Sequence, residues 1–342
     1  MRFGYWMPIF GGWLRNVRDE GMPVSWPYIA SLAAESEQHG FDLSLIAELN
    51  LNDIKGHRAP SLDCWALAPA VLAVTSTLEL MLAVRPNYHS PSLTAKAIST
   101  LDVIAPGRIS LNVVSSWWKD EAAQYGAPFD EHDARYARTS EWLEVIARLL
   151  REDTVSHTGP LYTLDGAVLE PKPSRPPMVY MGGESPKAKQ VISAMADAYV
   201  MHGDSPEVIA AKVAELSELR AKAGLPPLAF GVSGYVICRD SDEAVSAELD
   251  RILNVRASPD AYASYQDFVS GSQLESRVSL EEYSVSNRGL RSGLIGTPDQ
   301  IIDRIRAYEA AGVNLLLLQF SPQREEMQRF GTAVIDRYTG TS

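Results

Sequence analysis

The stretch MGGESPKAKQ, residues 181–190, has the composition of a loop that could bind an anion. Gly182 and Gly183 let the backbone approach a ligand closely. Ser185 and Pro186 form a typical N-cap and first-turn pair, so a helix should begin here. The free N–H groups and the positive dipole end of that helix favour a phosphate. An ordinary helix cap without a ligand is the alternative interpretation.

A second polar feature is Asn112 in the stretch NVVSSWWKDE, residues 112–121. An amide is uncommon in the middle of a strand and must satisfy its donors and acceptor. A heteroaromatic ring could do so, and so could the neighbouring backbone. Trp117 and Trp118 follow, and they could stack on a planar ligand or cover apolar structure.

Arg135 and Tyr136 fall in the first turn of the helix predicted to follow residue 131. A cation there opposes the helix dipole, so Arg135 needs a partner. A bound phosphate would serve, and so would the neighbouring carboxylates of Glu131 or Asp133.

The stretch RPNYHSP, residues 85–91, places Asn87 and His89 after another apolar run. A single histidine is more often structural than catalytic. The chain shows no Ser–His–Asp order, no GxSxG motif and no dinucleotide fingerprint after its first strand. A phosphate site without an evident acid–base pair indicates that a cofactor carries the chemistry.

The elements that must position these residues alternate along the whole chain. Short apolar runs typical of buried strands lie at residues 2–9, 41–48, 78–86, 109–115, 178–183, 197–202, 228–238 and 314–320. Helical stretches lie near residues 26–39, 63–76, 90–105, 132–152, 185–196, 205–223, 241–254, 297–311 and 323–338. Eight such units predict a single α/β domain over residues 1–342, a (β/α)8 TIM barrel whose ligands bind where the strands end.

Two segments interrupt the alternation. Residues 153–177 are rich in turn formers with short β-like pieces, which predicts a hairpin. Residues 256–293 are polar, rich in Ser and Tyr, and without a clear period. A connection of that length in a compact domain predicts a lid over the site.

Charge and cysteine content narrow the functional classes. The 31 basic and 43 acidic residues give a net charge of −12, which disfavours binding to nucleic acid or anionic membranes. The two cysteines, Cys64 and Cys238, have no metal-ligand spacing, so we expect neither zinc nor a disulfide framework. No signal or membrane segment is evident, so we expect a cytoplasmic protein with a small-molecule substrate.

Taken together, five motifs in order resemble the bacterial luciferase-like flavin monooxygenases, in particular the alkanesulfonate, dimethyl sulfone and pyrimidine-ring-opening enzymes. The most specific is AVRPNYHSPSLTAKAISTLDVIAPGRISLNVVSSWWKDE, residues 83–121. The others are HDARYARTSEWL (132–143), EPKPSRPP (170–177), MGGES (181–185) and LIGTP with its following helix (294–305).

The resemblance implies a (β/α)8 barrel that binds FMN non-covalently. It implies that reduced FMN comes from a separate NAD(P)H-dependent flavin reductase and is used with O2. The positions that match the family's flavin site are Ile46, Ala47, Asn112, Glu121, Arg135, Tyr136, Gly183, Glu184 and Ser185. By analogy with the family, a homo-oligomer, dimer or tetramer, is expected, and no metal.

The substrate is less closely indicated. Ser233 and Tyr235 stand where the alkanesulfonate enzymes carry an Arg-x-His pair, whereas Trp13 matches the sulfone and pyrimidine enzymes. We expect cleavage of a C–S bond in a small sulfone or sulfonate, sulfonated sugars included. A cyclic amide or pyrimidine-like ring is the first alternative, and a deazaflavin-dependent hydride transfer or a non-catalytic flavin-binding barrel are others.

Roles follow from these expectations. The predicted catalytic residues are Asn112, Tyr235 and His89. The predicted substrate-binding residues are Trp13, Asn87, Arg288 and Arg291. The two arginines would hold a sulfonate as a charge-assisted anion clamp, whereas Asn87 and Tyr235 would suit a neutral polar ring.

Overall fold

The computed structural model describes residues 1–253 and 279–340, and of residues 280, 281, 287 and 288 the backbone only. Eight parallel strands close into a barrel in the order β1-β2-β3-β4-β7-β8-β9-β12. Their bounds are β1 Arg2–Trp6, β2 Leu43–Ile46, β3 Glu79–Val84, β4 Ile109–Val113, β7 Met178–Met181, β8 Ala198–Met201, β9 Ala229–Tyr235 and β12 Leu315–Gln319. The predicted (β/α)8 fold is thus confirmed, and each strand lies within a predicted apolar run.

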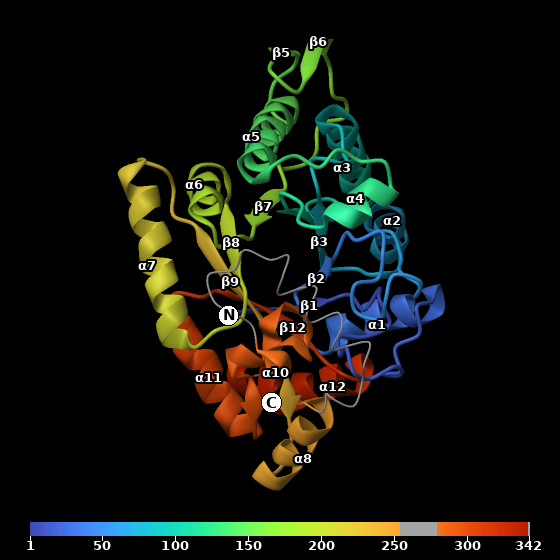
Figure 1. The fold of residues 1–342 in the computed structure, drawn as a ribbon, viewed down its shortest axis with the longest axis vertical. Coiled ribbons are helices and arrows are strands. Elements are labelled where there is room, and N and C mark those ends of the chain that lie inside the picture. The colour runs from blue at the N-terminus through green and yellow to red at the C-terminus, as the bar shows by residue number, and fades with distance from the viewer. Residues whose placement is uncertain (254–278, 341–342) are drawn as a thin grey trace.

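The helices surround the barrel, and all those named next except α4 fall in predicted helical stretches (Figure 1). They are α1 Trp26–Gln38, α2 Cys64–Val74, α3 Pro91–Ile104, α4 Lys119–Gln124, α5 His132–Leu149, α6 Pro186–Met195, α7 Pro206–Lys222, α8 Asp242–Leu253 and α11 Pro298–Ala310. The last predicted helix contains α12 Gln323–Phe330, the π-helical turn η3 Gly331–Ile335 and α13 Asp336–Thr339.

The first predicted insertion is a hairpin, as expected. Strands β5 Val155–Thr158 and β6 Thr163–Ala167 pair antiparallel and project beyond α5 at one end of the molecule (Figure 1). The buried carboxylate of Glu141 on α5 anchors this hairpin, because it accepts hydrogen bonds from the backbone N–H groups of Leu161 and Tyr162.

The second insertion differs from its prediction. Residues 254–278 lie outside the described part, so most of the proposed lid cannot be compared. Residues 279–293 form α10 Leu280–Tyr283 and the 3₁₀ helix η2 Ser286–Ser292. Ser284, Ser286 and Ser292 are buried, so these serines lie in packed structure and not on a polar surface loop.

The η2 segment is bonded to the loop after the first barrel strand and to the last barrel strand. Val285 forms a bridge with Leu14 in the loop after β1, and the Ser286 side chain exchanges hydrogen bonds with Gln319 at the end of β12. The short parallel pair of β10 Ile237–Cys238 and β11 Ile295–Gly296 then leads into α11. We call the carboxyl ends of the barrel strands, where the site is expected, the mouth of the barrel. The η2 segment therefore closes the side of the mouth that β1, β9 and β12 form.

The strand register shows which side chains face the interior. The ring of Phe3 packs edge-on against Phe330 in the surrounding helices, so the alternate residue Gly4 points into the barrel. Gly4 pairs with Leu43 on β2. Followed through β3, the same register gives Asn112 on β4 the same inward direction as Gly4. Asn112 therefore faces the interior, near the end of its strand.

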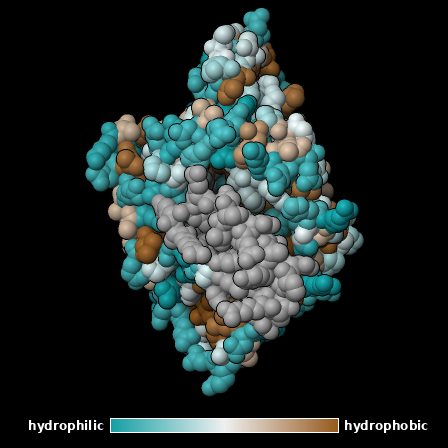
Figure 2. Space-filling model, viewed as in Figure 1, coloured by the Kyte–Doolittle hydropathy of each residue, from teal (hydrophilic) through white to brown (hydrophobic). Residues whose placement is uncertain are grey.

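The surface agrees with the acidic, polar composition. On the face in Figure 2, hydrophilic residues dominate the described surface and hydrophobic ones form small scattered groups. Within the described ranges, no helix has the length and apolar character needed to cross a membrane.

Candidate functional site

Asn112 lies on the open side of the barrel mouth. It is half-buried and stands beside Ala83 of β3 and Tyr180 of β7 in the strand register. Among residues 1–253 and 279–340, its side-chain amide has no hydrogen-bond partner. An interior amide without a protein partner is available to a ligand.

The predicted phosphate loop has the expected helix cap. Ser185 precedes α6, and its Oγ accepts a hydrogen bond from the N–H of Ala188 at 3.1 Å. Gly183 has φ +150°, and a Cβ there would come within 2.7 Å of the Ala188 Cβ and 3.2 Å of the Tyr136 hydroxyl. This position requires glycine, because a larger residue would fill the cradle between the loop and Tyr136.

Two residues of α5 complete this corner. Burial raises the pKa of Tyr136, against a hydrogen bond with Ser185 and the charge of Arg135. The Arg135 guanidinium lies 4.6 Å from the centre of the Phe129 ring, and its Nε is buried with no partner in the described part of the chain. Tyr136 thus contacts the Ser185 loop, and Arg135 stands next to it in the chain; their contact with a phosphate stays a prediction.

Sequence reasoning missed Ser116, which follows β4. It is buried and has φ +59°, a conformation that non-glycine residues rarely adopt, and its Oγ has no partner among the described residues. Such backbone conformations are frequent at functional sites. The next two residues, Trp117 and Trp118, stack with parallel rings 5.3 Å apart, and Trp117 is half-exposed.

Glu121, predicted to contact the flavin, has partners within the protein. Its side chain is fully buried and forms a two-pronged ion pair with Arg85, which is also buried. It further accepts a hydrogen bond from the backbone N–H of Asn50. The carboxylate is therefore bonded to the protein on both oxygens, and its contact with the flavin stays a prediction. The carboxylate positions the loops after β2 and β3.

Glu184 is also turned into the protein. Its buried carboxylate lies 3.3 Å from Nδ1 of His202 and 3.8 Å from Nζ of Lys212. His202 follows β8, and its side chain is 38% exposed. The structure thus adds a histidine that the sequence analysis did not select, beside the predicted phosphate loop.

Ile46 and Ala47, the pair predicted to touch the flavin ring, point in opposite directions. Ile46 is fully buried and has the outward strand parity of Ser44, and its carbonyl lies 3.3 Å from the Cys64 sulfur on α2. Its side chain therefore faces the helices, and its contact with the flavin ring stays a prediction. Ala47 has the inward parity and remains a candidate contact.

Two other predicted residues lie beneath the closed side of the mouth. Tyr235 is 1% exposed, and burial raises its pKa far above the ordinary value. Trp13 is 1% exposed, and its Nε1 donates a hydrogen bond to Gln323 at 2.7 Å. Both side chains are buried in this structure, and their catalytic and substrate-binding roles stay predictions.

The remaining substrate candidates have different positions. Asn87 donates a hydrogen bond to the carbonyl of Pro128 at 3.1 Å, and its buried Oδ1 has no partner within the described residues. Arg291 is held in an ion pair by Glu282. The side chain of Arg288 lies outside the described residues. His89, the third predicted catalytic residue, lies in the loop after β3 and bonds to Glu48.

The arrangement fits the chemistry of FMN. The polar groups without a partner among the described residues include the Asn112 amide, the Ser116 hydroxyl and the Arg135 Nε. Gly183 leaves space beside the start of α6, where N–H groups favour a phosphate. A group with a polar ring at one end and a phosphate at the other would satisfy both halves.

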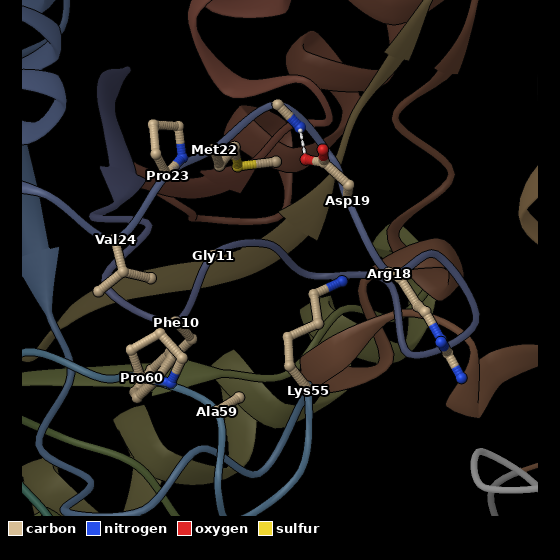
Figure 3. Close-up of a pocket in the computed structure, with 11 residues that line it drawn as sticks. Phe10, Gly11, Arg18, Asp19, Met22, Pro23, Val24, Lys55, Ala59 and Pro60 are labelled. Atoms are coloured by element: carbon tan, nitrogen blue, oxygen red, sulfur yellow. Dashed lines mark hydrogen bonds between the residues drawn. The ribbon is translucent and has the colours of Figure 1, made fainter.

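A separate hollow of about 400 Å³ lies between the loops after β1 and β2 (Figure 3). Its lining includes Phe10, Met22, Lys55 and Pro60. It contains none of the residues discussed above for the flavin, so we assign it no part in that site.

Comparison with known proteins settles the family. Residues 1–315 match the family described as luciferase-like monooxygenase. The chain belongs to this family. The sequence is 34% identical to an FMNH(2)-dependent dimethylsulfone monooxygenase of Pseudomonas putida, over 98% of this chain and 94% of that protein. The corresponding enzyme of Pseudomonas fluorescens (strain Pf0-1) is 32% identical over 98% and 93%.

Solved structures of luciferase-like monooxygenases share the fold. DmoA from Hyphomicrobium sulfonivorans superposes with a TM-score of 0.78 at 19% identity, covering 99% of this chain and 87% of that one. EDTA monooxygenase from Chelativorans sp. BNC1 gives 0.80 at 16%, covering 100% and 94%. The predicted family, the monooxygenase class and the reduced-FMN cofactor agree with these relatives and are confirmed.

Proposed function

We propose that this protein is a two-component monooxygenase that uses reduced FMN and O2 to cleave a C–S bond in a small sulfone. The observation that carries the proposal is the full-length similarity to two enzymes named as FMNH(2)-dependent dimethylsulfone monooxygenases. In such a reaction one oxygen atom enters the substrate and the other leaves as water, with two electrons from the reduced flavin.

Three described arginines support a neutral substrate over a sulfonate. Arg15 pairs with Asp53, Arg85 with Glu121 and Arg291 with Glu282. Each of these cations is already balanced by a carboxylate, so an anionic substrate would have to displace an ion pair. A sulfone has polar oxygens but no net charge, so it needs no such exchange.

Named residues have distinct parts in holding the cofactor. The start of α6, Ser185, Tyr136 and Arg135 would bind the phosphate, and the Asn112 amide would hydrogen-bond the flavin ring. When bound, reduced FMN supplies the electrons that activate O2. The η2 helix keeps bulk water from the β9 and β12 side of the mouth, which favours a protected reaction.

The proposal includes partners and a location. A separate NAD(P)H-dependent flavin reductase would supply reduced FMN, and the protein would act as a dimer or tetramer in the cytoplasm. The flavin dependence in the names of the relatives supports the reductase. The oligomer and the location rest on the sequence analysis.

The experiment supplies photoreduced FMN and O2 and compares dimethyl sulfone, a methanesulfonate, a cyclic amide and a pyrimidine. Oxygen uptake and sulfinate or sulfite formation are measured. Turnover of the sulfone with a sulfur-containing product is expected. Turnover restricted to the cyclic amide or pyrimidine would contradict the C–S assignment, and activity with a reduced deazaflavin but not with reduced FMN would contradict the cofactor. The fold alone does not separate these cofactors, since an F420-dependent secondary alcohol dehydrogenase superposes with a TM-score of 0.73.

A further inference from the structure

We propose that His89 is the acid that delivers a proton to the oxygen leaving as water, and that Glu48 is the positioning residue that orients it. The inference rests on the proposed monooxygenase function and assigns a part to Glu48 that the sequence analysis did not foresee. It is drawn from the hydrogen bonds around the loops that follow β2 and β3.

The Glu48 carboxylate has a different partner for each of its oxygens. Oε2 accepts a hydrogen bond from the backbone N–H of Arg85 at 2.8 Å and lies 3.5 Å from the Arg85 Nε. Oε1 bonds to Nε2 of His89. Because the carboxylate is acceptor-only and nearly buried, it requires a proton on Nε2 and fixes the imidazole in that tautomer.

Arg85 holds the carboxylate in place from the other side. Its guanidinium is paired with Glu121 and lies 4.2 Å above the Tyr88 ring, and its side chain is 1% exposed. A buried, doubly held arginine is rigid, so Glu48 has a fixed backbone to bond to. The charged and titratable groups around this cluster are Glu48, Arg85, Tyr88, Glu121 and Cys64.

The tautomer leaves Nδ1 of His89 for chemistry. Nδ1 has no hydrogen-bond partner in the described part of the chain, and the side chain is 23% exposed. The ring lies 5.5 Å from that of Trp65, whose Nε1 donates to the carbonyl of Ala83 at 3.1 Å. Ala83 is the register partner of Asn112, so His89 stands close to the open part of the mouth.

The proton balance of the reaction requires a proton donor, and Nδ1 can be that donor. Reduction of one oxygen atom of O2 to water consumes two electrons and two protons. The reduced flavin would supply both electrons and one of the two protons, and the imidazolium Nδ1–H would break to give the other proton to the departing oxygen. The neutral ring regains its proton from solvent, to which its exposed part has access.

The kinetic test compares His89→Asn, His89→Ala and Glu48→Gln, with His157→Asn as the matched control. His157 forms a similar pair with Glu141 in the hairpin region, at 3.1 Å. We expect His89→Asn to lower kcat by about 100-fold with little change in KM or in FMN affinity. Added imidazole should restore part of the activity of His89→Ala. Glu48→Gln should lower kcat less, and His157→Asn should match the wild type.

An unchanged kcat in His89→Asn would overturn the proposal, and so would a loss in His89→Ala that imidazole does not relieve. A second measurement does not depend on the substrate. Selective ¹⁵N-histidine NMR should show His89 protonated at Nε2 when the ring is neutral. Glu48→Gln should move that proton to Nδ1. The amide oxygen must still accept the hydrogen bond from the Arg85 N–H, so the amide NH2 faces Nε2 of the ring, which must then be an acceptor without a proton.

An Nδ1–H tautomer in the wild type would overturn the positioning role of Glu48. If the wild type oxidises no sulfone but shows the Nε2–H tautomer and its reversal in Glu48→Gln, the proposed substrate fails and the Glu48–His89 assignment stands. The two failures are therefore distinguishable.

Discussion

Gly289 of η2 lies directly on the backbone of Tyr235 at the end of β9. A Cβ at position 289 would come within 2.7 Å of the Tyr235 Cβ and 2.9 Å of its backbone nitrogen. The absence of a side chain is therefore what allows η2 to close this side of the barrel mouth. The same contact explains why Tyr235 is buried although its sequence position indicated an accessible residue.

The first prediction follows from this contact. Gly289→Ala should lower the free energy of unfolding by about 1–3 kcal/mol, because the added methyl group meets backbone that cannot move aside. Chemical denaturation measures the change. Gly231→Ala on β9, the strand that ends at Tyr235, is the control, since a Cβ there makes only ordinary contacts of 3.4 to 3.6 Å. Equal stability losses in both variants would show that the close contact is not the cause.

The second prediction concerns the buried pair of Arg85 and Glu121. Burial alone would lower the pKa of Arg85, but hydrogen bonding and the charge of Glu121 outweigh it and the net pKa is raised. Glu121→Leu should cost about 3–5 kcal/mol, because the buried guanidinium loses its two-pronged partner and keeps only the Glu48 carboxylate, 3.5 Å from its Nε. The double variant Arg85→Met with Glu121→Leu should regain part of that loss. Additive losses in a double-mutant cycle would contradict the coupling.

The third prediction is a pH dependence in the hairpin anchor. Burial would raise the pKa of Glu141, but hydrogen bonds from the Tyr162 N–H, from His157 and from the Leu161 N–H outweigh it, and the net pKa is lowered below 4.5. A carboxylate with a lowered folded-state pKa stabilises the fold above its unfolded-state value, and this stability is lost as the pH falls through the folded-state pKa. The melting temperature of the wild type should therefore exceed that of Glu141→Gln at pH 7. This difference should shrink as the pH falls below 4.5 and through the folded-state pKa of Glu141. A constant difference would show that Glu141 acts through its shape and not its charge.

The fold and the helix cap at Ser185 were predictable because their signals are local. Alternation of apolar runs with amphipathic stretches marked the strands, and Ser185 with Pro186 marked the start of α6 within one residue. Arg135 and Tyr136 could be placed because both lie in the first turn of a helix whose start is visible in the sequence.

What the sequence did not show is the direction of each side chain and its partners far along the chain. Glu121 and Arg85 are 36 residues apart, and no local pattern shows that they pair. Ile46 and Ala47 are adjacent, but strand parity turns one outward and the other inward. The burial of Tyr235 depends on a helix that begins some fifty residues later. These contacts arise only when the barrel closes, so the chain order alone could not give them.

The fourth prediction tests the phosphate loop. Ser185→Ala should weaken FMN binding by about 1–2 kcal/mol, since it removes a hydroxyl beside the expected phosphate. Fluorescence titration with FMN and riboflavin measures the effect, and the variant should lose most of the preference for FMN.

Ser205→Ala is the matched control for this variant. Ser205 also precedes a proline and caps its helix, α7, through the N–H of Val208, but it lies outside the phosphate corner. The two variants should lose similar amounts of stability, whereas only Ser185→Ala should lose FMN affinity. Equal affinities of the wild type for FMN and riboflavin would remove the phosphate assignment itself.

The last prediction concerns Asn112. The Asn112→Ala variant should keep the stability of the wild type, because its amide makes no hydrogen bond to the described residues and leaves none unmade. It should bind FMN more weakly, since a ligand loses the polar partner that the interior of the barrel offers. Ser110→Ala is the control: Ser110 faces the interior from the same strand one layer deeper, and its buried Oγ also has no partner in the described part of the chain. If Ser110→Ala weakens FMN as much as Asn112→Ala does, the effect comes from the strand and not from the amide. If Asn112→Ala unfolds at lower denaturant while the folded fraction binds FMN normally, Asn112 is structural and the ring contact must lie elsewhere in the mouth.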